Sequence, residues 1–113
     1  MRAILFTAAI LAVSATAAFA DDVMATRYGN TVVAIDASGV KTRIYYKADG
    51  TFTGKQGTLD FSGKWTLDAS NQLCLTYTVV PKGATNPTCV PASAHKVGDT
   101  WAGGMVSLVA GIQ

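Results

Sequence analysis

The residue types in this sequence that could perform acid–base chemistry are a single histidine, His95, several serines and seven aspartates. A hydrolase of the Ser-His-Asp kind needs a serine nucleophile, a histidine that takes its proton and a carboxylate that orients the histidine. The serines that could serve are Ser38, Ser62, Ser70, Ser93 and Ser107. None of them stands in a Gly-x-Ser-x-Gly turn, which presents the nucleophile in one large class of hydrolases. The composition therefore permits a small hydrolase that uses His95, but it singles out no catalytic residue.

Metal chemistry is not indicated by the sequence either. One histidine cannot build a multi-histidine site, and no Asp-x-Asp-x-Asp-Gly loop for calcium occurs. Asp36, Asp49 and Asp68 stand in segments rich in turn residues, where an aspartate bonds to its own backbone. Asp60 and Asp99 lie nearer predicted strands and have no such explanation. We expect no catalytic residues, no metal site and no cofactor.

The two cysteines, Cys74 and Cys89, predict a disulfide bond. Both follow the N-terminal segment that is typical of exported proteins, and an even pair in an oxidising compartment most simply forms one bridge. The alternative is a redox-active pair, but the spacing differs from Cys-x-x-Cys. The bridge would close a loop of about 15 residues, which is worth about 3 kcal/mol on the chain-entropy model.

The first twenty residues have the three parts of a secretory signal. A positive charge at Arg2 precedes an apolar stretch, which ends in the small-residue triplet Ala18-Phe19-Ala20. A membrane anchor is the alternative, but the stretch is barely long enough to span a bilayer. We expect cleavage near Ala20, a single domain over residues 21–113, and a periplasmic or secreted location in a bacterium.

The charge of the predicted mature chain gives no sign of a polyanionic partner. Without Arg2, eight lysines and arginines face seven aspartates and no glutamate, so the net charge is +1. Nucleic-acid-binding domains and proteins that bind anionic membranes carry a strong basic patch. No later run approaches the roughly 20 apolar residues of a transmembrane helix. We therefore expect neither a nucleic-acid partner nor a membrane span in the mature form.

The elements that position these residues are predicted to be strands, because threonine, valine, glycine and aromatic residues dominate and no helical periodicity follows Ala20. The expected strands are Thr31–Ile35, Val40–Lys47, Thr51–Lys55, Thr58–Leu67, Gln72–Val80, Thr88–Val90, Ala94–Ala102 and Met105–Ile112. Short connections favour antiparallel neighbours. The sequence predicts an all-β antiparallel meander of about six to eight strands, forming a closed or partly closed barrel, with a sandwich as the alternative.

Alternation along two of these strands predicts which side chains face the core. In the fourth strand Phe61, Gly63, Trp65 and Leu67 share one face. In the fifth strand the shared face consists of Leu73, Leu75, Tyr77 and Val79. Cys74 is therefore expected on the opposite face, away from the main apolar stripe.

Part of the chain resembles small uncharacterised secreted β-proteins of alphaproteobacteria. The residues that carry the resemblance are Asp49-Gly-Thr-Phe52, Gly63-Lys-Trp65 and Leu73-Cys-Leu75, in that order. The resemblance implies an exported β-domain and no activity. Gly63-Lys-Trp65 is also similar to the Gly-x-Trp motif of lipocalins and avidin-type barrels, although there the motif lies in the first strand and here some forty mature residues precede it.

Aromatic residues are the best candidates for binding, in particular Tyr45, Trp65 and Trp101. Tyr45 and Tyr46 are adjacent, so in a strand they point to opposite faces and one of them lies outside a single-faced core. The first function hypothesis is a non-enzymatic domain that binds a protein or cell-envelope partner through aromatic and threonine-rich strand faces. The alternative is a carrier of a small apolar ligand in a barrel cavity. A hydrolase that uses His95 is a third hypothesis.

Overall fold

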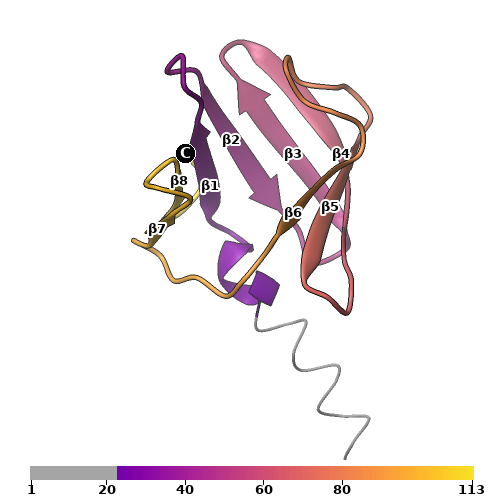
Figure 1. Ribbon diagram of the computed structural model, residues 1–113, viewed down its shortest axis with the longest axis vertical. Coiled ribbons are helices and arrows are strands. Elements are labelled where there is room, and N and C mark those ends of the chain that lie inside the picture. Colours follow the sequence, from indigo (N-terminus) through magenta and orange to yellow (C-terminus); the bar gives the residue numbers. More distant parts are fainter. Residues whose placement is uncertain (1–22) are drawn as a thin grey trace, which may run out of the picture.

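The computed structural model describes residues 23–113, so the predicted signal segment lies outside the described residues. The described chain forms a short 3-10 turn, Ala25–Arg27, and eight strands (Figure 1). The strands are β1 (Thr31–Ile35), β2 (Lys41–Tyr46), β3 (Thr51–Gln56), β4 (Leu59–Leu67), β5 (Gln72–Tyr77), β6 (Thr88–Pro91), β7 (Thr100–Trp101) and β8 (Val106–Val109). This confirms the predicted all-β fold.

All eight strands belong to one antiparallel sheet, which is curled into a half-barrel rather than split into a sandwich. Their order is β6-β5-β4-β3-β2-β1-β8-β7. The first six strands form a meander, and β8 returns to pair with β1 over Thr31 to Ala34. Apart from the β1–β8 pair, neighbours in the sheet are therefore also neighbours in the sequence. β6 and β7 are the two edge strands, and they do not pair with each other.

The open seam of the ring lies between β6 and β7. Figure 1 shows the connection after β6 crossing this open side to reach β7. Along it, the backbone amide of Ala92 donates to the carbonyl of Asn71 at 2.8 Å, and that of Gly98 donates to Leu108 at 2.9 Å. A coil segment thus lies where a closed barrel would have one more ladder of strand pairing.

Three hairpin turns are shaped by the aspartates that the sequence places there. One carboxylate oxygen of Asp36 accepts the amides of Ser38 and Val40, each at 2.9 Å. Asp49 accepts the amide of Thr51 at 3.0 Å, and Asp68 accepts those of Ser70 and Gln72. Hydrogen bonds from the Ser38 hydroxyl and the Val40 amide lower the pKa of Asp36. The turn function predicted for these aspartates is confirmed.

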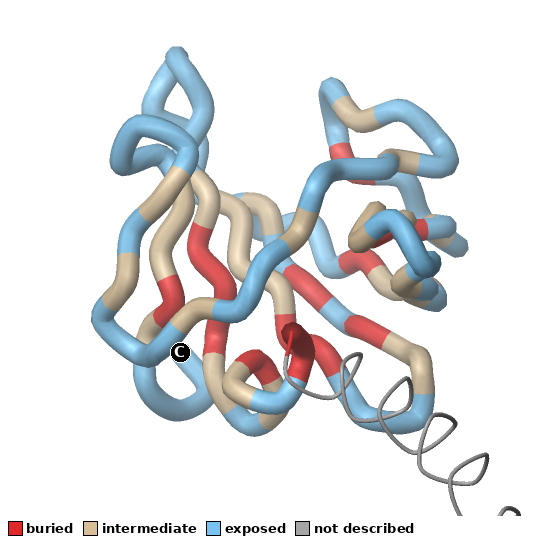
Figure 2. The backbone as a smooth tube through the Cα atoms, turned by 60° about the horizontal axis from the view of Figure 1, so that its bottom comes forward, coloured by how far each residue is buried: buried red, intermediate tan, exposed pale blue. Residues whose placement is uncertain are grey.

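The concave face of the sheet is filled by side chains. Phe52, Met24 and Leu108 are each only 1% exposed, and the buried positions of the tube gather on the inner side of the curl (Figure 2). The ring of Phe52 meets that of Tyr77 edge-on, with centroids 5.5 Å apart. Burial inside this core raises the pKa of Tyr46 far above its usual range.

Two glycines make room for the aromatic side chains of this core. In the β3–β4 ladder Phe52 lies opposite Gly63, and Gly54 lies opposite Phe61. A Cβ atom on Gly54 would lie 2.3 Å from Cζ of Phe61, and one on Gly63 would lie 2.8 Å from Cζ of Phe52. Each phenyl ring therefore lies over the glycine on the neighbouring strand, which is the packing that aromatic–glycine cross-strand pairs use.

The structure corrects three details of the expected elements. No helix was expected after Ala20, but the turn Ala25–Arg27 covers the lower end of the half-barrel, and its neighbour Met24 enters the core. A turn this short shows no periodicity that a sequence pattern could reveal.

The predicted strand Ala94–Ala102 is reduced to β7, because the amide of Lys96 donates to the Asp99 carboxylate and closes a turn.

The fifth strand is also shorter than expected. The Asn86 side chain hydrogen-bonds the backbone amide and carbonyl of Tyr77, at 2.9 and 3.1 Å, where a strand neighbour would otherwise bind. The chain leaves the ladder at this point. Val79, which we expected on the inner face, is 45% exposed.

The predicted disulfide is present between Cys74 and Cys89, which lie directly opposite each other on β5 and β6. Their Cα atoms are 4.0 Å apart. Cys74 pairs with Thr66 on its other side, so the bridge lies on the outer face, as the alternation predicted. Among residues 23–113, no helix has the length and apolar character needed to cross a membrane.

Candidate functional site

Tyr45 and Tyr46 point to opposite faces of β2, as their adjacency required. Tyr46 is 6% exposed and belongs to the core cluster. Tyr45 lies on the outer face, where its hydroxyl donates to the backbone carbonyl of Gln113 at 2.7 Å. The Thr31 hydroxyl also donates to the carbonyl of Gly111 and accepts the amide of Gln113. Together these hydrogen bonds hold residues 111–113 against the outer face. Tyr45 is thus outside the core but only 9% exposed.

Beside Tyr45 the outer face is hollowed. The hollow has a volume of about 310 Å³ and is lined by Tyr45, Thr53, Gly54, Lys55, Asp60, Phe61 and Ser62. Tyr45 pairs with Thr53 on β3, and Thr53 pairs with Ser62 on β4, so three hydroxyl-bearing side chains follow one another across three strands. Cross-strand neighbours have Cβ atoms about 5 Å apart. The ladder therefore places the Thr53 and Ser62 hydroxyls side by side on neighbouring strands, whereas the Tyr45 hydroxyl is bonded to Gln113.

Charged side chains border the same hollow. Lys55 and Asp60 are cross-strand neighbours, and their charged atoms are 3.4 Å apart. Both side chains are more than half exposed, so the pair contributes little to stability. It is free to rearrange around a polar ligand. A second outer hollow of about 270 Å³ lies over β8, β1 and β2 and includes Lys41 and Arg43.

Trp65 lies on the inner face at the lower end of the half-barrel and is half-buried. Its indole nitrogen donates to the carbonyl of Lys47 at 2.8 Å, and its ring centroid is 6.3 Å from that of Tyr28. Lys47 belongs to the turn between β2 and β3. Trp65 therefore links this turn and Tyr28 to the sheet. It does not line the hollow beside Tyr45.

Trp101 lies at the seam and forms a cluster with three residues of the crossing segment. Its ring stacks on that of His95, with centroids 3.7 Å apart and planes 5° from parallel. Nε2 of His95 lies 3.3 Å from the Ser93 hydroxyl, and Nδ1 lies 3.6 Å from a carboxylate oxygen of Asp99. We call Ser93, His95, Asp99 and Trp101 the seam cluster. The predicted strand Ala94–Ala102 would have placed His95 near the start of a strand, but His95 lies on the crossing segment before β7, and its side chain is 16% exposed.

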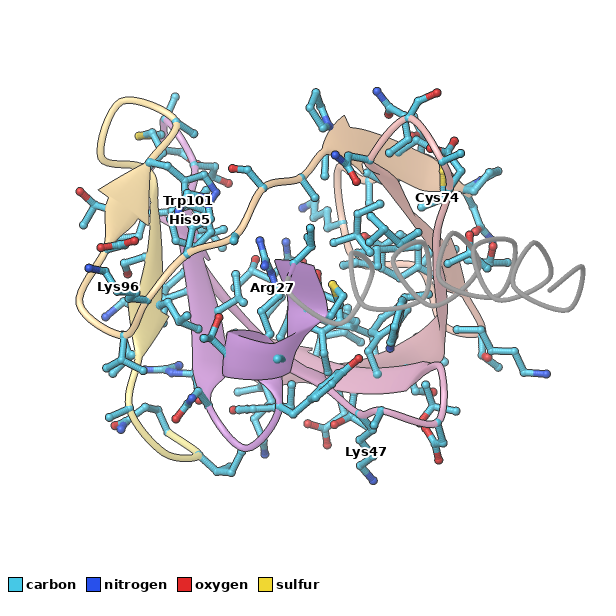
Figure 3. All side chains as sticks on the ribbon, turned by 90° about the horizontal axis from the view of Figure 1, so that it is seen from below. Arg27, Lys47, Cys74, His95, Lys96 and Trp101 are labelled. Carbon is cyan, nitrogen blue, oxygen red and sulfur yellow. A yellow bond between two sulfur atoms is a disulfide. The ribbon has the colours of Figure 1, made fainter. Side chains whose placement is uncertain are left out.

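Arg27 joins the N-terminal turn to the seam cluster (Figure 3). Its guanidinium donates to the carbonyls of Val23 and Ser93 and lies 5.8 Å from the ring centre of Trp101. Arg27 is 3% exposed, and no carboxylate of the described chain forms an ion pair with it. Desolvation lowers its pKa, and the nearby Tyr46 acts in the opposite direction.

The structure does not bring the three predicted aromatics together. Tyr45 lines the outer hollow, Trp65 fastens the lower turn, and Trp101 belongs to the seam. Sequence reasoning missed Arg27 altogether, because its position before the first strand carries no motif. The signal that could have found it is the proximity of Arg27 to Thr31, the first residue of β1, which keeps its side chain near the sheet.

No protein-family model, curated protein or solved structure matches this chain.

Proposed function

We propose that this chain is an exported binding domain that takes up a glycan of the bacterial cell envelope on its outer face. The observation that carries the proposal is the hollow beside Tyr45, which the neighbouring hydroxyls of Thr53 and Ser62 and the Lys55–Asp60 pair line. Its volume of about 310 Å³ is at the small end of the range typical of ligand sites, which suits one or two sugar units.

The chemistry of the hollow favours a hydroxyl-rich ligand over an apolar one. Thr53 and Ser62 offer hydroxyls that both donate and accept, Lys55 donates and Asp60 accepts. A sugar ring presents donors and acceptors of both kinds around its edge. The ring of Tyr45 serves as a wall of the site rather than as a free stacking platform, because it is largely covered.

The carrier alternative requires a hollow interior. In this structure the concave face is occupied by Phe52, Met24 and Leu108, and the two hollows lie on the outer face. No observation favours an apolar ligand inside the half-barrel, and we do not adopt that function.

The predicted cleavage site and the disulfide support the exported location that the proposal requires. The predicted cleavage near Ala20 precedes Val23 and Met24, which are the first residues in the core. Cleavage there would remove none of the residues that the structure describes. The Cys74–Cys89 disulfide fits an oxidising compartment such as the periplasm.

Binding to cell-wall glycan tests the proposed function. Residues 21–113 with the disulfide intact would be mixed with purified peptidoglycan sacculi and sedimented, and soluble saccharides would be screened by glycan array. We expect retention that Thr53→Val and Lys55→Gln reduce at least several-fold. Thr66→Val is the matched control, because Thr66 is an exposed outer-face threonine on β4 that does not line the hollow.

Two results would contradict the proposal. One is that neither sacculi nor any arrayed glycan is retained under gentle washing. The other is that Thr53→Val and Thr66→Val bind equally well, since the hollow would then make no contribution.

A further inference from the structure

The seam cluster has the connectivity of a nucleophile, a base and an orienting carboxylate. A single imidazole, that of His95, contacts the Ser93 hydroxyl through Nε2 at 3.3 Å and the Asp99 carboxylate through Nδ1 at 3.6 Å. In hydrolases that use this connectivity, one ring nitrogen takes the proton of the serine and the other faces the acid. Ser93 is exposed, so its hydroxyl is accessible to a ligand.

We infer that Ser93, His95 and Asp99 form an acyl-transfer site that hydrolyses small, solvent-exposed carboxylic esters. In this site Ser93 is the nucleophile, His95 is the general base, and Asp99 is a positioning residue. The site is separate from the outer hollow beside Tyr45, so this inference does not depend on the proposed glycan binding.

The orientation of His95 is held by its surroundings. Its ring lies flat on Trp101, and its backbone carbonyl accepts a hydrogen bond from the Thr26 hydroxyl. Ser93 is held in the same way, because its carbonyl accepts two hydrogen bonds from Arg27 at 3.3 Å. Both contacts to the N-terminal turn use backbone atoms and leave the Ser93 and His95 side chains available. Preorganisation of this kind is what a catalytic pair needs.

Asp99 also has a structural role. The carboxylate oxygen nearest His95 accepts the backbone amide of Lys96 at 2.9 Å, which shapes the turn before β7. This contact keeps the carboxylate beside Nδ1 of His95. Figure 3 shows Lys96 pointing away from the stacked His95 and Trp101, so its ammonium group does not cover the site.

Donors for a developing oxyanion are also present. Within residues 23–113, the backbone amides of Ser93 and Ala94 donate to no protein acceptor. Both residues are exposed, and both amides adjoin the Ser93 side chain. Backbone amides beside the nucleophile are the usual stabilisers of a tetrahedral oxyanion.

The reaction would proceed in two steps. The Ser93 hydroxyl oxygen bonds to the ester carbonyl carbon while its proton moves to Nε2 of His95; the ester C–O bond then breaks, and the leaving alkoxide takes that proton as an alcohol. Water attacks the resulting acyl-serine, gives a proton to Nε2, and releases a carboxylic acid. Ser93 recovers its proton from His95, and no oxidant or other co-reactant is needed.

The test uses residues 21–113 with the disulfide intact, p-nitrophenyl acetate as the ester and an alkyl fluorophosphonate as the covalent probe. We expect the probe to label Ser93, located by peptide mass spectrometry. Ser93→Ala should abolish labelling and ester turnover while keeping the carbonyl that Arg27 binds. His95→Phe, which keeps an aromatic ring on Trp101, should lower kcat/KM by about 100-fold or more.

Two further variants separate catalysis from structure. Asp99→Asn keeps an acceptor for the Lys96 amide but removes the charge, so we expect kcat to fall at least about tenfold with KM unchanged. Ser70→Ala is the control, since Ser70 is exposed and its hydroxyl forms no hydrogen bond in the described structure. Absence of labelling at Ser93, labelling confined to another residue, or equal turnover by Ser93→Ala and Ser70→Ala would overturn the inference.

Discussion

Replacing Gly63 by alanine should destabilise the protein because the new methyl group has no space. A Cβ atom built on Gly63 would lie 2.0 Å from the backbone carbonyl oxygen of Thr76 and 2.8 Å from Cζ of Phe52. Ordinary carbon–oxygen contacts are about 3.3 Å or longer. The β4–β5 ladder would have to open by about 1 Å at this point, because the nearest obstacle is backbone and not a flexible side chain.

The size of the effect follows from two opposing contributions. Overpacking of this kind costs about 1–3 kcal/mol, and a clash with backbone belongs at the upper end. Alanine regains up to about 1 kcal/mol by reducing the entropy of the unfolded chain. We expect a net loss of about 2 kcal/mol in the free energy of unfolding. For a domain of this size, that corresponds to a fall in Tm of about 8–16 °C.

Thermal unfolding followed by circular dichroism measures this loss, with the Cys74–Cys89 bridge intact. Lys64→Ala is the matched control, because Lys64 is the next residue on β4, is exposed and faces outward. We expect it to change stability by less than about 0.5 kcal/mol. A Gly63→Ala protein that melts within about 2 °C of the parent would refute the reasoning, since the ladder would then tolerate a displacement that we treat as costly.

Three other predictions follow from the core, the bridge and the seam. Reduction of the Cys74–Cys89 bridge should lower the free energy of unfolding by about 3 kcal/mol without abolishing the β-rich circular dichroism spectrum; two freely alkylated thiols in the unreduced protein would contradict the assignment. Arg27→Met removes the hydrogen bonds that hold Ser93, so amide hydrogen exchange in residues 92–99 should accelerate about tenfold or more while β3 and β4 are unaffected. The control Arg43→Met, on the outer face, should leave exchange in residues 92–99 unchanged, and equal exchange in both variants would show that the Arg27–Ser93 hydrogen bonds do not hold this segment. Because the pKa of Tyr46 is raised in the folded state, the unfolded chain loses this proton first, and stability should fall by up to about 1.4 kcal/mol per pH unit above about pH 10; Tyr46→Phe should remove that part of the pH dependence, and an unchanged slope would show that other groups cause it.

Local features of the sequence predicted the elements well where each was decided by neighbouring residues. Asp36, Asp49 and Asp68 mark turns because a short carboxylate side chain reaches the amide two positions later, and in Asp36 and Asp68 also the amide four positions later. The alternation in β4 predicted the inward face because successive residues of a strand must point to opposite sides. The disulfide was also predictable, since two strands joined by a single loop return alongside each other.

The candidate sites were less accessible to sequence reasoning. The hollow beside Tyr45 exists because Thr53 and Ser62 occupy matching positions on two further strands, and register across strands is set by turn geometry and packing together. The contact of Gln113 with Tyr45 joins residues 68 positions apart in the sequence. No local pattern indicates such a contact.

The sequence by itself determined that this is an all-β chain with defined hairpins and one disulfide, because these depend on spacings of a few residues and on composition; the signal segment stays a prediction. Only the tertiary structure decided that β8 pairs with β1, that the ring stays open between β6 and β7, and that Arg27 bonds the Ser93 carbonyl on the segment that crosses this seam. Those features depend on contacts between residues more than sixty positions apart. The free energy of such contacts comes from burial and hydrogen bonding in the assembled fold, which no short segment of the sequence encodes.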